Sequence, residues 1–235
     1  MKIALVGYGK MGRAIEKIAL DRGHEISAII KSKQDLGKIS KDNCNVSIEF
    51  TNPQSAFENI RYCIENGIPI LSGTTGWLNH KKELDNLCME KDGTFFYASN
   101  YSIGVNIFFK INELVAKIMN KNTDYHVEMD EIHHIHKKDF PSGTAITLAE
   151  GIIKNMNQIH SWTENQQTEN QLKINSYREG EVPGTHKISY ESGIDNISLI
   201  HTAHSREGFA KGAVLVAEWL TDKQGVLSMT DFLTF

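Results

Sequence analysis

Short apolar runs alternate with segments of helical periodicity through the N-terminal part of the chain. Lys2–Val6 is an apolar run that stops at a glycine, which is typical of a buried strand. The apolar residues of the next segment recur at helical spacing: Met11, Ala14, Ile15, Ile18 and Ala19. Further strands are expected at Glu25–Ile30, 46–50, 69–72 and 94–99, with helices after Pro53 and over 80–90. This alternation predicts a doubly wound parallel sheet, whose ligands lie beyond the carboxyl ends of the strands.

The pattern changes after residue 120. Strands are expected in succession at 125–134, 173–177, 187–191 and 197–204, with one helix over 142–156 and a polar loop over 162–170. This succession predicts an α+β domain with a mostly antiparallel sheet. The apolar stretch Ile103–Met119 carries two lysines and two asparagines, so we interpret it as a buried amphipathic helix and not as a membrane span. A last helix is expected over 213–220.

Composition narrows the class of protein. The chain has 235 residues, 40% of them hydrophobic and 23% charged, which favours one or two globular domains. The net charge of −4 comes without a basic stretch, so nucleic acid is not an expected partner. Three scattered cysteines argue against a secreted disulfide framework, and the apolar start is too short for a signal peptide. These features favour a cytoplasmic protein.

A glycine turn connects the first strand to the first helix. It reads Gly7-Tyr8-Gly9-Lys10-Met11-Gly12 and matches the G-x-G-x-x-G pattern. In a Rossmann-type domain these glycines permit a tight turn, a close approach to a pyrophosphate and the packing of helix on strand. The free N–H groups of the helix start favour phosphates. We therefore expect a nicotinamide dinucleotide here; the alternative is a glycine turn that only packs.

The second strand ends without the acid that usually binds the adenosine ribose. Lys31, Ser32 and Lys33 stand there instead. Two cations and a hydroxyl suit a 2′-phosphate, which favours NADPH over NADH as the cofactor. A solvated lysine pair at a strand end is the alternative. Small and hydroxyl-bearing residues at later strand ends are further candidates for cofactor binding: Thr51, Gly73, Thr74, Thr75, Ala98, Ser99, Asn100 and Tyr101.

A segment rich in histidine precedes the helix over 142–156. Ser142 is a good N-cap after a proline, and the N–H groups of Gly143 and Thr144 at such a helix start bind a carboxylate well. His134 and Lys137 are expected beside that carboxylate, and His133 is expected to donate or relay a proton, since imidazole titrates near neutral pH.

Two other interpretations of this segment remain. His133, His134 and His136 are all metal-ligand types, but adjacent residues of a strand point to opposite faces, which disfavours one ion between the first two. We expect no metal. The second alternative is that the segment is an exposed polar loop without a functional role.

Taken together, these motifs resemble the 4-hydroxy-tetrahydrodipicolinate reductase (dihydrodipicolinate reductase) family. The longest match is Glu131-x-His133-His134-x-x-Lys137-x-Asp139-x-Pro141-Ser142-Gly143-Thr144-Ala145. Shorter matches follow the same order: Gly7 to Gly12, Phe50-Thr51-x-Pro53, Gly73 to Gly76, Ser99 to Ser102, Gly104-Val105-Asn106, Arg178-x-Gly180, Gly184-x-His186, His201, and Arg206-x-x-Phe209-Ala210-x-Gly212-Ala213. The resemblance covers essentially the whole chain, although 32–45 is short for the family.

The resemblance implies an activity and a domain plan. The reaction is the NAD(P)H-dependent reduction of a cyclic hydroxy-dicarboxylate, after or with loss of water, to tetrahydrodipicolinate in diaminopimelate and lysine synthesis. His133 is implied as the proton donor or acceptor and Lys137 as a second catalytic donor, while His134, Ser142, Gly143 and Thr144 bind substrate. Residues 1–101 and 207–235 form the dinucleotide domain, and 102–206 form an inserted substrate and oligomerisation domain of a homotetramer.

Rival functions are a different Rossmann-type reductase of a small anionic substrate, such as an aspartate or inosose dehydrogenase, and a non-catalytic dinucleotide sensor. A metal-dependent hydrolase is a weaker alternative. His133 and Lys137 are the residues whose presence favours the reductase over the sensor.

Overall fold

The computed structural model of the chain describes residues 1–205 and 207–234. Arg206 and Phe235 lie outside the described residues. Arg206 belongs to one of the motifs above, and two of the expected domain limits fall on these two residues. The chain divides into two compact units, one made of residues 1–103 and 207–234 and the other of residues 104–205. The expected boundary at 101/102 differs from the first of these divisions by two residues.

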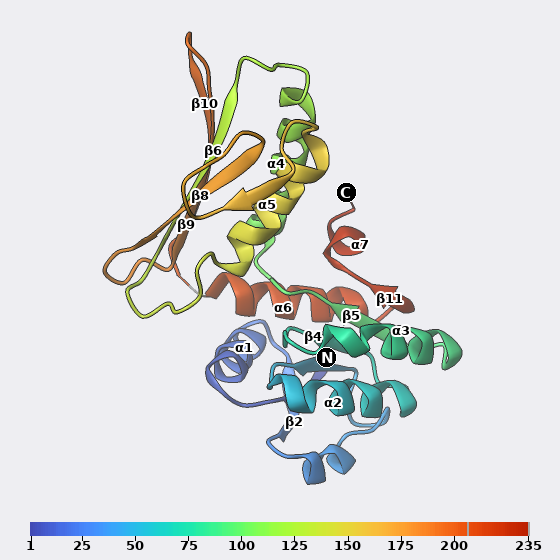
Figure 1. The fold of residues 1–235 in the computed structure, drawn as a ribbon. Helices are drawn as coiled ribbons and strands as arrows, with labels where there is room; N and C mark the ends of the chain where they lie inside the picture. The colour runs from blue at the N-terminus through green and yellow to red at the C-terminus, as the bar shows by residue number, and fades with distance from the viewer. Residues whose placement is uncertain (206, 235) are drawn as a thin grey trace. The chain divides into compact units, whose positions relative to one another are not determined.

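Unit 1 contains a six-stranded parallel sheet in the order β11-β5-β4-β3-β1-β2 (Figure 1). Its strands are β1 (Lys2–Val6), β2 (Glu25–Ile30), β3 (Val46–Glu49), β4 (Ile70–Ser72), β5 (Thr94–Tyr97) and β11 (Gly225–Leu227). Its helices are α1 (Lys10–Asp21), α2 (Pro53–Glu65), α3 (Lys81–Glu90), α6 (Glu207–Leu220) and α7 (Met229–Leu233), with short 3₁₀ turns at Lys33–Lys38 and Leu78–His80. This is the doubly wound Rossmann-type architecture that the alternating pattern predicts.

Two hydrophobic layers hold the helices of unit 1 on the sheet. On one face, α1 and α6 pack on alternate residues of β1 and β3, such as Leu5 and Ile48. On the other face, α2 and α3 pack on residues such as Val6 and Phe95. Strands β2 and β3 lie on opposite sides of β1, so the direction of strand order reverses at β1. Ligands of such sheets bind in the crevice beyond the carboxyl ends of the strands at this reversal.

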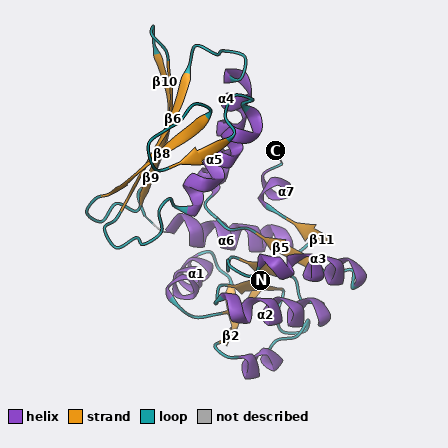
Figure 2. Cartoon of the chain, in the orientation of Figure 1, coloured by secondary structure: helices purple, strands orange, loops and turns teal. Residues whose placement is uncertain are grey.

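Unit 2 is built around a five-stranded mixed sheet in the order β10-β9-β6-β8-β7. Its elements are α4 (Ile103–Met119), β6 (His126–His133), α5 (Gly143–Asn155), β7 (Ser161–Thr163), β8 (Gln171–Arg178), β9 (Gly184–Glu191) and β10 (Asn196–Ala203). Helices α4 and α5 share one core with the sheet, which includes Phe108, Leu148 and Ile188 (Figure 2). The loop 134–142 therefore connects the end of β6, the central strand of this sheet, to the start of α5.

The sheet of unit 2 differs from the expectation in its pairing. The two pairings of β9, with β6 and with β10, are antiparallel, whereas β8 pairs in parallel with both β6 and β7. Succession along the chain suggests hairpins, but α5 crosses over between β6 and β8 and makes their pairing parallel. The short strand Ser161–Thr163 overlaps the start of the region 162–170 that was expected to be a loop, and β11 and α7 were not expected.

No helix among the described residues is long and apolar enough to cross a membrane. Ile103–Met119 is a helix, as expected, with Phe108, Ala116 and Met119 in the core of unit 2. It is not buried on all sides, because Ile107, Ile111, Leu114 and Ile118 are 40 to 63% exposed.

Candidate functional site

The glycine turn of unit 1 leaves its backbone open to a ligand. Gly7 has φ = +97°, and a Cβ there would lie 2.1 Å from the Phe50 carbonyl oxygen. A Cβ on Gly12 would lie 2.4 Å from the Gly7 carbonyl oxygen, whereas one on Gly9 would meet nothing within 4 Å. Helix α1 starts directly after Gly9, and no side chain caps its first N–H groups. This cradle fits an anionic pyrophosphate.

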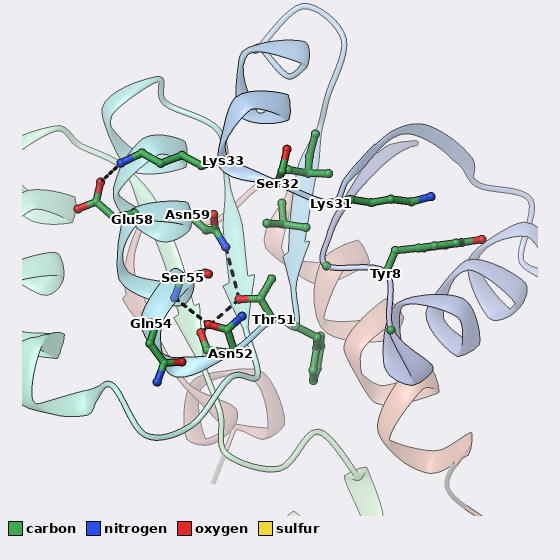
Figure 3. Close-up of a pocket in the computed structure, with 15 residues that line it drawn as sticks. Tyr8, Lys31, Ser32, Lys33, Thr51, Asn52, Gln54, Ser55, Glu58 and Asn59 are labelled. Atoms are coloured by element: carbon green, nitrogen blue, oxygen red, sulfur yellow. Dashed lines mark hydrogen bonds and ion pairs between the residues drawn. The ribbon is translucent and has the colours of Figure 1, made fainter.

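A pocket of about 450 Å³ lies beside this turn, beyond the ends of β1, β2 and β3 (Figure 3). Seven of the predicted cofactor residues line it: Gly7, Tyr8, Gly9, Lys31, Ser32, Lys33 and Thr51. The other lining residues are Val6, Ile30, Phe50, Asn52, Gln54, Ser55, Glu58 and Asn59. The polar ones among these come from the first turns of α2, which begins with Asn52 as its N-cap and Pro53 at its first position. Sequence reasoning named none of these α2 residues.

The end of β2 is cationic in the structure, but its two lysines differ. The Lys31 ammonium and the Arg13 guanidinium lie 5.2 and 5.3 Å from the centre of the Tyr8 ring. Lys33 instead pairs with Glu58 at 3.1 Å. The Ser32 hydroxyl donates to Asp35, whose pKa is lowered to about 2 by the hydrogen bonds from Lys38 and Ser32. Lys31 and Arg13 form no ion pair with a described residue, and Arg13 was not predicted.

The other predicted cofactor residues occupy three kinds of position. Lys10 and Met11 stand in the first turn of α1; Thr75, Ser99 and Asn100 stand at the ends of β4 and β5, where Thr75 and Ser99 are exposed. A Cβ on Gly73 would lie 2.1 Å from the Phe50 ring. Thr74, Ala98 and Tyr101 are buried. The Tyr101 hydroxyl donates to the Ser72 carbonyl at 2.8 Å, so its side chain belongs to the core and only its backbone is left for a ligand.

The histidine segment of unit 2 comes together around a buried carboxylate. Glu131 has no exposed surface and accepts hydrogen bonds from the backbone N–H of Ser142 at 3.1 and 3.2 Å. The Arg178 guanidinium lies 3.4 Å from the same carboxylate. His133 Nδ1 and His186 Nε2 lie 3.4 and 3.8 Å from its other oxygen. Glu131 therefore joins the predicted catalytic histidine to the start of α5.

Strand register explains this cluster. On β6, Glu131 and His133 are two residues apart and point to the same buried face. His186 stands opposite Glu131 on β9, and Arg178 stands opposite His133 on β8. Gly184 makes room for the His133 ring, since a Cβ there would lie 3.0 Å from Nε2. Sequence reasoning gave no role to Glu131, Arg178 or His186; their places in the resemblance motifs were the available signal.

The helix start beside this cluster is formed as predicted from its cap. Ser142 Oγ accepts the Ala145 N–H at 3.2 Å and contacts His186 Nε2 at 3.2 Å. Gly143 is exposed and Thr144 half-buried, and no residue that the structure describes accepts a hydrogen bond from their N–H groups. These two N–H groups at the positive end of α5 are suited to an anion.

Lys137 and Arg178 are connected to this helix start through Asp139. The Lys137 ammonium lies 2.8 Å from the Asp139 carboxylate, and Arg178 donates to the Asp139 carbonyl at 2.5 Å. Burial works to raise the pKa of Asp139, but the hydrogen bond from Lys137, a backbone hydrogen bond and the charges of Lys137 and Arg178 together outweigh it, and the pKa is lowered. His136 is exposed and pairs with Glu181, and the His134 ring centre lies 6.0 Å from that of His136. The interpretation as a plain exposed loop does not fit His133, which is 7% exposed.

A metal ion would meet a different set of ligands from the three histidines considered above. Within the described residues, Glu131, His133 and His186 offer ligand atoms within 4.8 Å of one another. The positive Arg178 guanidinium shares the Glu131 carboxylate, which disfavours a cation at the same place.

Burial changes the charge of the two central imidazoles. It lowers the pKa of His133 to about 4, against the attraction of Glu131, and Lys137 and Arg178 lower it further. Burial and the neighbouring His133 lower the pKa of His186 to about 3. Glu131 has a lowered pKa, because hydrogen bonds from Ser142 and the charge of His133 overcome its burial. At neutral pH the site is an ionised carboxylate beside two neutral imidazoles.

These pKa values make unfolding pH-dependent. In the unfolded chain both imidazoles bind protons below about pH 6.5, whereas in the folded protein they bind them only near pH 4 and pH 3. The unfolded state therefore binds more protons in this window, and stability falls as the pH drops. We expect the two histidines together to lower the free energy of unfolding by about 2 to 4 kcal/mol between pH 7 and pH 5.

Urea unfolding at pH 7 and pH 5 measures this effect. The variant His186→Gln is expected to lose about half of the pH dependence. His160→Gln is the matched control, because His160 is exposed. A His186→Gln protein with the pH dependence of the wild type would contradict the assignment.

Comparisons with known proteins decide the family. Residues 1–101 match the model described as dihydrodipicolinate reductase, N-terminus, and residues 104–233 match the one described as dihydrodipicolinate reductase, C-terminus. The chain belongs to the dihydrodipicolinate reductase family. The resemblance inferred from the motifs is thereby confirmed, and the chain is an oxidoreductase of a pyridine-nucleotide-dependent family.

The similarity to known members of this family extends along the full length of the chain. It is 44% identical over 234 residues to the 4-hydroxy-tetrahydrodipicolinate reductase of Christiangramia forsetii, covering 100% of this chain and 98% of that protein. The structure of a dipicolinate-bound dihydrodipicolinate reductase from Paenisporosarcina sp. TG-14 has the same fold, with a TM-score of 0.82 at 19% identity and 99% of each chain covered. Aspartate dehydrogenase from Thermotoga maritima has a TM-score of 0.51 at 12% identity, covering 95% of this chain and 97% of that one. The last likeness concerns the fold alone.

Proposed function

We propose that this protein reduces 4-hydroxy-tetrahydrodipicolinate (dihydrodipicolinate once its water is lost) to tetrahydrodipicolinate with NAD(P)H, in the diaminopimelate and lysine pathway. The 4-hydroxyl group leaves as water, before or together with the transfer of hydride. The observation that carries the proposal is the cluster of unit 2: a buried imidazole, two cations and two free N–H groups lie at one helix start. Such a site suits a small ring with two carboxylates. The full-length relative of the same name supports this choice of substrate.

The substrate carboxylates are proposed to bind at the start of α5. Gly143 and Thr144 donate their N–H groups to one carboxylate, and Ser142 holds this turn in place through its bond to Ala145. Lys137 supplies positive charge to the ring anion, and His134 contacts it from the end of β6. Each donor is fixed before substrate arrives, which reduces the reorganisation that binding requires.

His133 is proposed as the residue that gives the proton. Its imidazole is neutral in the free protein because burial lowers its pKa to about 4. A bound dianion adds negative charge beside it and thereby raises that pKa, so the imidazole takes up a proton when substrate is present. Glu131 lies on the Nδ1 side, which leaves Nε2 as the atom that exchanges protons with the substrate. Lys137 is a second donor.

The reduced nicotinamide, when bound, supplies the hydride. In unit 1 the residues proposed to hold the dinucleotide are the glycine turn, Lys10 and Met11 at the start of α1, and the lining of the pocket beyond β1, β2 and β3. Residues 73–75 and 98–101 are proposed at the nicotinamide half, since they end β4 and β5.

A coupled assay tests the function. The unstable substrate is made in place by its synthase, and oxidation of NADH or NADPH is followed by absorbance. Turnover that depends on both the synthase and this protein is the expected result. Binding of a dinucleotide without any turnover would replace the proposal by a dinucleotide sensor, and turnover abolished by chelation would favour metal-dependent chemistry.

Cofactor preference gives a separate prediction. We propose that NADPH is preferred over NADH, because Lys31 and Arg13 flank Tyr8 without a paired acid. Replacing either cation with alanine is expected to lower the preference about tenfold or more, the effect of losing one charge-assisted hydrogen bond of about 1.5 to 3 kcal/mol. The measurement is the ratio of kcat/KM for the two cofactors.

Lys17→Ala is the matched control for this preference, since Lys17 is an exposed cation one turn further along α1. Lys33→Ala is expected to have a smaller effect than Lys31→Ala, because Lys33 already pairs with Glu58. An unchanged ratio in both the Lys31 and Arg13 variants would contradict the prediction.

We also propose a cytoplasmic homotetramer without nucleic-acid or membrane partners, assembled through unit 2. The family resemblance supports the tetramer, and the three free, buried cysteines support the cytoplasmic location.

A further inference from the structure

A buried carboxylate that the proposed proton transfer does not use lies at the end of β3. Glu49 has no exposed surface. It accepts hydrogen bonds from the hydroxyls of Ser72 at 2.5 Å, of Thr74 at 2.9 Å, and of Thr51. Because Glu49 pairs with Ser72 in the parallel register of β3 and β4, the donors converge from two neighbouring strand ends. The carboxylate is thus held by hydrogen bonds at the carboxyl edge of the sheet, where β3 and β4 end.

The hydrogen-bond directions favour the ionised form of Glu49. Thr74 Oγ1 accepts the Thr51 N–H at 2.8 Å, and Thr51 Oγ1 accepts from the Asn59 amide at 3.4 Å. A hydroxyl has only one proton. Thr74 donates it to Glu49, and the Glu49 carboxylate is a much closer acceptor for the Thr51 hydroxyl than the Asn52 carbonyl at 3.4 Å. Burial raises the pKa of Glu49, and the three hydroxyl bonds oppose that rise. The network is therefore arranged around a negative charge.

No cation of the described residues, whether Lys, Arg or His, forms an ion pair with this carboxylate. A charge in the interior is screened much less than one in water, so its field extends several ångströms beyond its hydrogen-bond partners. Thr51 lines the pocket beside the glycine turn, and Thr74 belongs to the turn after β4. The field of Glu49 therefore acts on the crevice at the carboxyl ends of β3 and β4.

We propose that Glu49 is an electrostatic positioning residue that stabilises the oxidised nicotinamide relative to the reduced one. This inference rests on the proposed dinucleotide site. The oxidised ring carries a positive charge and the reduced ring is neutral, so a fixed negative charge beneath the crevice favours the oxidised form. By the same difference it favours the loss of hydride from the bound reduced cofactor. Thr51 and Thr74 hold the carboxylate through their hydroxyls, and Thr51 also lines the pocket beside the glycine turn.

The ratio of two dissociation constants tests the proposal. The affinities of NADP⁺ and NADPH, and of NAD⁺ and NADH, are measured by calorimetry for the wild type and Glu49→Gln. Gln keeps the shape and removes the charge, so the oxidised form is expected to lose affinity relative to the reduced form by about fourfold to fifteenfold. That is the effect of one charge across about 10 Å at an effective dielectric constant of about 20 to 40.

Two variants separate charge from structure. Glu49→Asp keeps the charge and is expected to keep the wild-type ratio. Glu49→Ser removes the charge and leaves room for water at the hydroxyls, so it replaces Glu49→Gln if that protein does not fold. A purely structural role changes both affinities alike, and an unchanged ratio in a charge-free variant overturns the proposal. An equal change of ratio in Glu49→Asp also overturns it, whereas a wild type that binds no dinucleotide removes the proposed function itself.

Discussion

Replacing His133 with glutamine is expected to lower kcat about 10²- to 10⁴-fold, the usual contribution of a positioned general acid or base. Gln is close in size to His and keeps a polar group beside Glu131, but it cannot carry a proton to the substrate. Affinity for the dinucleotide is expected to stay unchanged, because the proposed cofactor residues belong to unit 1. Steady-state kinetics and calorimetric binding of the cofactor measure the two quantities.

The chain offers a matched control for each proposed proton donor. His126 begins the same strand as His133 and is exposed, so His126→Gln is expected to retain wild-type kcat. Lys137→Gln is expected to lower kcat strongly, whereas Lys138→Gln changes an adjacent exposed lysine and is expected to have little effect. Full activity of the His133 variant, or of the Lys137 variant, would remove that residue from the proposed mechanism.

Glu131→Ala is expected to lower the free energy of unfolding by about 3 kcal/mol or more, as when one partner of a buried ion pair is removed. The substitution leaves the Ser142 N–H without its acceptor and the Arg178 guanidinium without its carboxylate. It also takes away the charge that lies beside His133. Urea unfolding followed by circular dichroism gives the change in free energy.

Glu128→Ala serves as the control for this substitution. Glu128 stands three residues earlier on the same strand and is exposed, and changes at such positions usually stay within about 0.5 kcal/mol. Equal losses of stability in the two variants would show that Glu131 is not the centre of the cluster.

Sequence patterns predicted most of the elements, because apolar periodicity depends on which face of an element is buried. The parallel sheet of unit 1 followed from alternation, and the start of α5 followed from the Pro141-Ser142 cap. The pairing within unit 2 did not follow. The crossover of α5 makes β8 parallel to β6, and periodicity along one strand contains no information about its neighbours. The short strands β7 and β11 have too few residues to show a period.

The candidate sites were predictable in part for a similar reason. Gly7 and His133 stand in local motifs, so the sequence identified them directly. Glu131, Arg178 and His186 meet only through strand register, over separations of up to 55 residues along the chain. Arg13 and Lys31 are brought near each other because both side chains lie beside the Tyr8 ring. Long-range contacts of this kind become visible when the fold is known.

Unit 1 is made of two segments, and its last strand, β11, pairs with β5 across more than a hundred intervening residues. During synthesis the ribosome therefore releases all of unit 2 before α6 and β11 emerge. One face of the nascent dinucleotide sheet lacks α6 until then, so apolar residues such as Leu5 and Ile48 are not yet covered by this helix. We expect folding of unit 2 to precede completion of unit 1, and chains that stall before α6 to be substrates for chaperones.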